Sequence, residues 1–156
     1  MSIIVPNKRG AQFNLADIEV SILDYVEKSG NIVSQLSNSF QYYIIEVRLL
    51  AQIWKVGRRY SDFDEMHRWL KQDLDPQTAD SIPELPEKKF FFSKTEEFLD
   101  QRLRGLRRYI KLLILIYEAI ENPILQKFFK VDINFDPNFE YAPIPFSNAT
   151  RDEEDP

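Results

Sequence analysis

The stretch "GRRYSDF", residues 57–63, marks the point where the hydrophobic pattern of this chain changes its period. Before it, residues 52–60 read "QIWKVGRRY", which is typical of a β-strand. After it, apolar side chains recur at helical spacing, at Phe63, Met66 and Leu70. A strand that runs directly into a helix is therefore predicted here.

The same stretch combines two arginines with an aromatic ring at the predicted junction, at Arg58, Arg59 and Tyr60. Ser61 with Asp64 three residues later resembles a capping box, which predicts where the helix begins. Arginine is suited to bidentate binding of phosphate, and a helix N-terminus favours an anion. The junction is therefore a candidate site for an anionic ligand.

Two further strands are predicted before this junction. Residues 13–25 alternate apolar and polar side chains, which is typical of a half-buried strand. Residues 40–50, "FQYYIIEVRLL", show the clearest alternation in the chain. Three consecutive strands with short connections predict an antiparallel sheet.

The chain after the junction is predicted to be helical, apart from one loop. Residues 75–89 hold Pro83 and Pro86 and predict an irregular, extended loop. Residues 94–117 carry an apolar stripe at helical spacing and predict a long amphipathic helix. Residues 123–131 predict a last short helix. The fold class is therefore predicted to be α+β, a three-stranded antiparallel sheet packed against a helical subdomain.

The domain limits follow from length and composition. A chain of 156 residues is about one domain. Residues 1–12 are predicted to be a disordered lead-in, 13–131 the folded domain, and 132–156 an acidic, disordered tail. The acidic tail accounts for much of the net charge of −5, whereas the folded middle is locally basic.

The composition also excludes several kinds of site. The chain has no cysteine and one histidine, His67, so disulfides, thiolate nucleophiles, Cys-based zinc sites and His-rich metal clusters are excluded. No nucleophile–base pair and no Gly-rich phosphate loop is found. The sequence therefore predicts no enzyme, no cofactor and no metal site. Its N-terminus lacks a signal-peptide pattern, so a cytoplasmic protein is expected.

Three motifs in a fixed order resemble the phox-homology (PX) domain family. They are "RRYSDF" at 58–63, "IPELPEKKF" at 82–90 and "FLDQRLRGLRRYI" at 98–110. Family members have a three-stranded sheet packed on helices, an Arg-Arg-Tyr-Ser motif, a proline-rich loop and a helix with Arg-x-x-Gly-Leu. The resemblance covers about residues 13–131, and with little more than this domain the chain resembles the small sorting nexins.

The resemblance implies a pocket for a phosphoinositide head group, most often that of phosphatidylinositol 3-phosphate. By position, Arg59 would hold the 3-phosphate and Tyr60 would pack against the inositol ring. Lys88 would meet the 1-phosphate, and Arg102 would bond the 4- and 5-hydroxyls. Arg58 more often supports the fold in such domains.

The proline loop departs from many relatives, which have Pro-Pro-Lys where this chain has Glu87 before Lys88. Three phenylalanines follow in "FFF" at 90–92. In relatives this region includes side chains that dip into the bilayer. We expect Phe91 and Phe92 to insert into the membrane here, whereas Phe90 is the best candidate for burial in the core.

Plain structural interpretations of the four site residues stay open from the sequence. Arg59 could be a solvated charge at a strand end, Tyr60 a core aromatic and Lys88 a loop charge. Arg102 could form a salt bridge along its helix, with partners from a set of three acidic residues: Glu96, Glu97 and Asp100. Spacing alone does not show that these segments converge.

Three functions compete at this point. The leading one is a membrane-targeting module for phosphatidylinositol 3-phosphate, peripheral on endosomal membranes and acting in membrane trafficking. The alternative is a protein-interaction adaptor with a weak or unused lipid pocket, with trafficking proteins as partners. Nucleic-acid binding is disfavoured, because the aromatic residues are not interleaved with the basic ones as stacking platforms.

Overall fold

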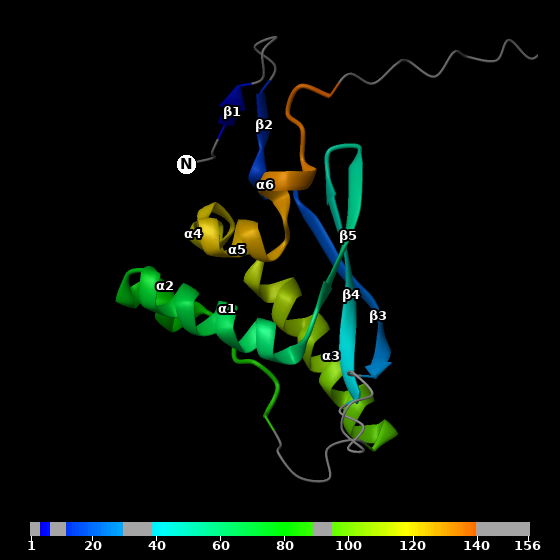
Figure 1. Ribbon diagram of the computed structural model, residues 1–156. Coiled ribbons are helices and arrows are strands. Elements are labelled where there is room, and N and C mark those ends of the chain that lie inside the picture. Colours follow the sequence, from blue (N-terminus) through cyan, green and yellow to red (C-terminus); the bar gives the residue numbers. More distant parts are fainter. Residues whose placement is uncertain (1–3, 7–11, 30–38, 89–94, 140–156) are drawn as a thin grey trace, which may run out of the picture.

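The structure of the protein, a computed structural model, describes residues 4–6, 12–29, 39–88 and 95–139. Its central element is a three-stranded antiparallel sheet in the order β3 (Glu19–Ser29), β4 (Ser39–Leu49) and β5 (Gln52–Arg58). Two long helices lie beside the sheet, α1 (Tyr60–Asp73) and α3 (Glu96–Leu113) (Figure 1). Three short helices lie on the same side of the sheet as α1: α4 (Tyr117–Glu121), α5 (Pro123–Phe128) and α6 (Val131–Asn134). The predicted α+β class with a three-stranded antiparallel sheet is confirmed.

The sheet consists of β3 (Glu19–Ser29), β4 (Ser39–Leu49) and β5 (Gln52–Arg58). Four alternating side chains of the central strand are fully buried, in agreement with the alternation of residues 40–50: Tyr43, Ile45, Val47 and Leu49. The register of β3 against β4 shifts between Ile22 and Asp24, so Leu23 forms a bulge.

The predicted first strand over 13–25 was placed too early. The short strand β2 (Gln12–Asn14) and a 3₁₀ turn (Leu15–Asp17) come first, and β3 continues to Ser29. Strand β2 pairs with β1 (Ile4–Pro6), so the expected disorder of residues 1–12 does not hold for residues 4–6. Residues 12–14 form a strand because their backbone pairs with residues 4–6, and a local sequence pattern does not reveal such a partner.

Helix α1 (Tyr60–Asp73) begins one residue before Ser61, and the capping box is shifted by two residues from the predicted one. The backbone N–H of Arg59 donates to Asp62 Oδ2 at 2.7 Å, the reciprocal half of such a box. Asp62, rather than Asp64, therefore caps this helix. Asp64 instead lies within 4 Å of two basic side chains, those of Arg68 and Lys88.

The predicted loop over 75–89 contains a short helix, α2 (Pro76–Ser81). Asp75 caps it by accepting from the Thr78 backbone N–H at 3.1 Å, and Pro76 occupies the first turn. This N-terminal signature was present in the sequence, but the density of proline and polar residues favoured a loop. Residues 82–88 have no regular secondary structure.

Helix α3 (Glu96–Leu113) ends four residues earlier than predicted. The following run, "ILIY", is apolar at every position, so its periodicity contains no stop signal. Two backbone N–H groups fold back instead, from Leu115 to Leu112 O and from Ile116 to Leu113 O. Three short helices complete the fold: α4 (Tyr117–Glu121), α5 (Pro123–Phe128) and α6 (Val131–Asn134).

The domain also extends beyond the predicted boundary at residue 131. The Gln52 side chain donates to Asp136 O at 2.6 Å and accepts from the Asp136 N–H at 2.9 Å. These bonds attach the segment after α6 to the start of β5. Residues 140–156 of the predicted tail lie outside the described residues.

Aromatic contacts join the sheet to the helices in the core. The Phe63 ring of α1 stands edge-on to Tyr43 of β4, with centroids 6.1 Å apart, and to Phe128 of α5, at 4.9 Å. All three side chains are buried.

Within the described part of the chain, no helix is both long and apolar enough to cross a bilayer.

The only histidine of the chain joins α1 to α3. His67 Nδ1 lies 2.8 Å from the hydroxyl of Tyr109, which is buried. Burial lowers the pKa of His67, and the charge of Lys71 adds to this shift against weaker opposing carboxylates. The folded protein therefore favours the neutral imidazole.

We expect a pH dependence of stability from His67. Above its unperturbed pKa of 6.5 the imidazole is neutral in both the folded and the unfolded protein, so the contribution of His67 to the free energy of unfolding does not change with pH there. As the pH falls below that value, the unfolded chain takes up a proton that the folded one resists, and the free energy of unfolding falls. Urea unfolding at pH 7.5 and 5.5 measures this difference. The loss should be smaller in His67→Gln, and an equal loss in both proteins would contradict the assignment.

Candidate functional site

A hollow of about 140 Å³ lies where β4 and α1 begin, facing α3. Figure 1 shows that these three elements meet at one end of the sheet. Seven residues line the hollow: Phe40, Gln41, Tyr43, Arg59, Tyr60, Ser61 and Arg102. Two arginines and no carboxylate are among them, so the site is suited to an anion.

The two consecutive arginines have different positions and roles. Arg58, the last residue of β5, donates from Nε to Phe128 O at 2.9 Å and from Nη2 to Lys127 O at 3.2 Å. Its guanidinium therefore ties the sheet to α5. Arg59 is exposed, and its Cζ lies 4.1 Å from the centre of the Phe40 ring at the hollow.

Arg102 reaches the hollow from α3 between two aromatic rings. Its Cζ lies 4.1 Å from the centre of the Tyr60 ring and 4.6 Å from that of Phe98. Its Nε is buried and forms no hydrogen bond with any described residue. A buried donor without a partner is costly, so a ligand oxygen at this position would be stabilised.

Arg102 does not form the helix-surface salt bridge that was one alternative. No salt bridge joins it to Glu96, Glu97 or Asp100 in the part of the chain that the structure describes. Its charge instead faces two tyrosines. Burial raises the pKa of Tyr43 and of Tyr60, and the Arg102 charge only partly opposes this. Both phenols therefore stay neutral near pH 7 and leave the Arg102 charge available.

The proline loop is held between α1 and α3. The Tyr60 hydroxyl donates to Pro86 O at 2.5 Å. On the other side, a Cβ built on Gly105 would lie 2.6 Å from Pro86 Cγ, so only glycine lets α3 approach the proline ring this closely. These two contacts position the segment that carries Lys88.

The comparisons with known proteins agree with this arrangement. The family model described as "PX domain" matches residues 50–132, which is more than half of the chain. This chain belongs to the PX domain family. PX domains bind phosphoinositide-containing membranes, and the domain described above is one of them.

Similar proteins include mouse sorting nexin-13, which is 29% identical over 103 residues, and the mouse serine/threonine-protein kinase Sgk3, which is 29% identical over 119. These alignments cover 64% and 71% of this chain, but only 10% and 23% of those proteins. The PX domain is thus the shared part of much longer relatives. A solved designed CISK-PX domain is 29% identical with a TM-score of 0.61, over 72% of this chain and 98% of that one.

The PX domain brings together three of the four residues singled out from the sequence. Arg59, Tyr60 and Arg102 line one hollow. Lys88 does not line it. Its Nζ lies 3.9 Å from Asp64 Oδ2 on α1, and half of its side chain is exposed. Phe91 and Phe92 lie outside the described residues.

Sequence reasoning missed the aromatic support of the PX site. Phe40 and Phe98 each contact one of the two arginines, and Gln41, Tyr43 and Ser61 complete the lining. Phe40 precedes the junction by about 20 residues and Phe98 follows it by about 40. No spacing links such distant positions, so only the folded chain reveals them.

Proposed function

We propose that this PX domain binds the head group of phosphatidylinositol 3-phosphate and thereby recruits its protein to endosomal membranes. One observation carries the proposal. The guanidinium groups of Arg59 and Arg102 reach one hollow from two different elements, and no carboxylate lines it. The domain acts by binding alone and performs no catalysis.

Each residue has a distinct part in this proposal. Arg59, exposed beside Phe40, holds the 3-phosphate through a bidentate pair. Arg102, with its unpaired Nε, bonds the ring hydroxyls. Tyr60 supplies an aromatic wall between them. Its hydroxyl also positions the proline loop.

Lys88 is assigned to the 1-phosphate, near the point where the lipid enters the bilayer. It must turn away from Asp64 to do so. At 3.9 Å, with the Lys88 side chain half exposed, this salt bridge is weak. Exposed pairs contribute about 0–1 kcal/mol, which a charge-assisted bond to phosphate offsets.

Liposome co-sedimentation across the mono- and polyphosphorylated inositol lipids tests the proposal. We expect selective sedimentation with the 3-phosphate lipid, because the paired guanidinium groups recognise one phosphate beside ring hydroxyls. Equal binding to every anionic lipid would contradict a specific pocket and favour a simple electrostatic surface.

The membrane contact also includes an apolar part. The double variant Phe91→Ser, Phe92→Ser should bind the same liposomes more weakly, because burial of apolar area at the interface stabilises attachment. The thermal unfolding temperature should stay close to that of the unmodified protein. Unchanged sedimentation would show that these side chains do not enter the bilayer.

A second function, docking of a trafficking protein, is compatible with lipid binding. The similarity to sorting nexin-13 covers only the PX domain, so it does not indicate which cargo or partner proteins bind. We propose that any such partner binds away from the lipid hollow.

A further inference from the structure

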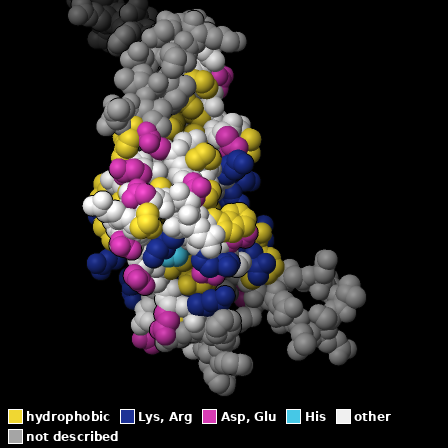
Figure 2. Space-filling view, turned by 90° about the vertical axis from the view of Figure 1, so that its left-hand side faces the viewer, with side chains coloured by type: hydrophobic (Ala, Val, Ile, Leu, Met, Phe, Trp, Pro, Cys, Tyr) yellow, Lys and Arg dark blue, Asp and Glu magenta, His cyan; other side chains and the backbone are white. Residues whose placement is uncertain are grey.

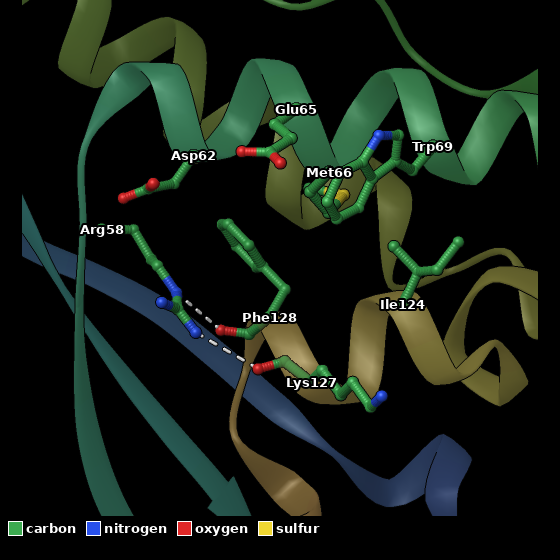
Figure 3. Close-up of a pocket in the computed structure, with 8 residues that line it drawn as sticks. All are labelled: Arg58, Asp62, Glu65, Met66, Trp69, Ile124, Lys127 and Phe128. Carbon is green, nitrogen blue, oxygen red and sulfur yellow. Dashed lines mark hydrogen bonds between the residues drawn. The ribbon is translucent and has the colours of Figure 1, made fainter.

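A second hollow, of about 200 Å³, lies between α1 and α5 and shares no lining residue with the one at Arg59. Figure 3 shows it between the two helices, with Arg58 at one end. A hollow of this volume has room for one large side chain.

The hollow has an apolar floor and an exposed aromatic rim. Met66 and Phe128 are buried at its base, and Ile124 is half-buried on the α5 side. Trp69 stands at the edge with 52% of its surface exposed. Tryptophan is one of the three residue types enriched among the residues that dominate protein–protein binding energy. The face seen in Figure 2 likewise exposes hydrophobic groups among charged ones.

The α1 wall adds an unpaired negative charge. The carboxylate of Glu65 points into the hollow in Figure 3. It is in no hydrogen bond or salt bridge with any other described residue. Asp62, three residues earlier on the same wall, accepts only the Arg59 backbone N–H in the described structure. A cation entering here would therefore find a carboxylate ready to pair.

The two basic residues of the hollow do not meet this need. Arg58 uses two of its guanidinium nitrogens, Nε and Nη2, to bond the α5 backbone at Phe128 O and Lys127 O. Figure 3 shows the Lys127 ammonium at the opposite wall, turned away from Glu65. The hollow is thus acidic along α1 and basic at Lys127 of α5 and at Arg58 of β5, with apolar surface between these walls.

We infer that this hollow docks a short segment of a partner protein in which a large apolar side chain stands next to a lysine or arginine. The apolar side chain packs on Met66 and Phe128 beside Trp69, and the cation pairs with Glu65. The site does not overlap the lipid hollow, so membrane and partner can bind at the same time. This inference holds whether or not the lipid specificity proposed above is right.

A displayed library of short random peptides, selected on the full chain, tests the inference. The expected consensus is a large apolar residue adjacent to Lys or Arg. A synthetic consensus peptide should move the indole N–H resonance of Trp69 in the NMR spectrum. The other tryptophan, Trp54, donates its indole N–H to Phe129 O and should stay in place.

Matched variants locate the binding. Trp69→Ala should bind the consensus peptide about tenfold more weakly, as expected for a hot-spot aromatic. Glu65→Gln should bind it about two- to fivefold more weakly, since it loses one exposed ion pair. Glu19→Gln, an exposed carboxylate on β3, and Arg59→Ala, in the lipid hollow, should both bind it as the unmodified protein does.

Several results would overturn the inference. These are a library without a consensus, a consensus with acidic residues in place of the basic one, and binding unaffected by Trp69→Ala. A Trp69 shift caused by phosphatidylcholine–phosphatidylserine vesicles alone would assign the surface to the membrane. Self-association that Trp69→Ala abolishes would assign it to a second copy of the chain.

Loss of lipid binding in Arg59→Ala with peptide binding intact would separate the two proposals.

Discussion

Arg59→Ala is expected to weaken binding to liposomes with phosphatidylinositol 3-phosphate by roughly ten- to hundredfold. A charge-assisted hydrogen bond contributes about 1.5–3 kcal/mol, and each 1.4 kcal/mol is a factor of ten in affinity. The side chain is exposed and stacks only on Phe40 within the described structure, so its removal should change stability little. Co-sedimentation and thermal unfolding measure the two quantities separately.

The matched control is Arg48→Ala, which removes the same charge at the far end of β4. Arg48 is exposed and stands eight residues from Phe40, roughly 26 Å along a strand. It should lose little binding, through the general charge of the domain alone. Arg59→Lys should recover only part of the affinity, because an ammonium lacks the bidentate geometry. Equal losses in Arg59→Ala and Arg48→Ala would show that no specific phosphate contact exists.

Gly105→Ala is expected to destabilise the domain by up to about 2 kcal/mol. In an exposed helix, replacement of glycine by alanine normally stabilises by about 1 kcal/mol. Here the new Cβ would lie 2.6 Å from Pro86 Cγ and 3.0 Å from Pro86 Cβ. Overpacking costs about 1–3 kcal/mol, so a net loss of up to about 2 kcal/mol remains after the gain in helix propensity. Because the proline loop must shift, lipid binding should weaken as well.

Two further proteins test the cause of this loss. Gln101→Ala, exposed on the same helix, should change the free energy of unfolding by less than about 0.5 kcal/mol. The double variant Gly105→Ala, Pro86→Ala should lose less stability than the sum of the single variants, because the clashing ring is gone. A stabilised Gly105→Ala would show that the loop yields to α3 without strain.

Much of the fold could be predicted from local patterns. The alternation in residues 40–50 predicted a central strand, and Tyr43, Ile45 and Val47 are fully buried. The change of period at residues 57–63 predicted the strand-to-helix junction. Element ends were less accurate. The apolar run after Leu113 obscured the end of α3, and α2 was missed among proline and polar residues.

The candidate site was predictable as a set of residues but only partly as a geometry. The family resemblance singled out Arg59, Tyr60 and Arg102, and the structure places all three at one hollow. The family resemblance could not predict that Arg102 is held between two rings or that Lys88 lies beside Asp64. These contacts join segments that lie more than 20 residues apart and share no periodicity.

Local sequence patterns were enough to predict the α+β class, the alternation of the central strand and the three family motifs, because each depends on residues close together in the chain. The different roles of the neighbouring arginines appear only in the folded domain. Arg58 binds backbone carbonyls of α5, whereas Arg59 stays exposed at the hollow. Successive side chains of an extended chain point in opposite directions, and what each one meets depends on the helices packed there.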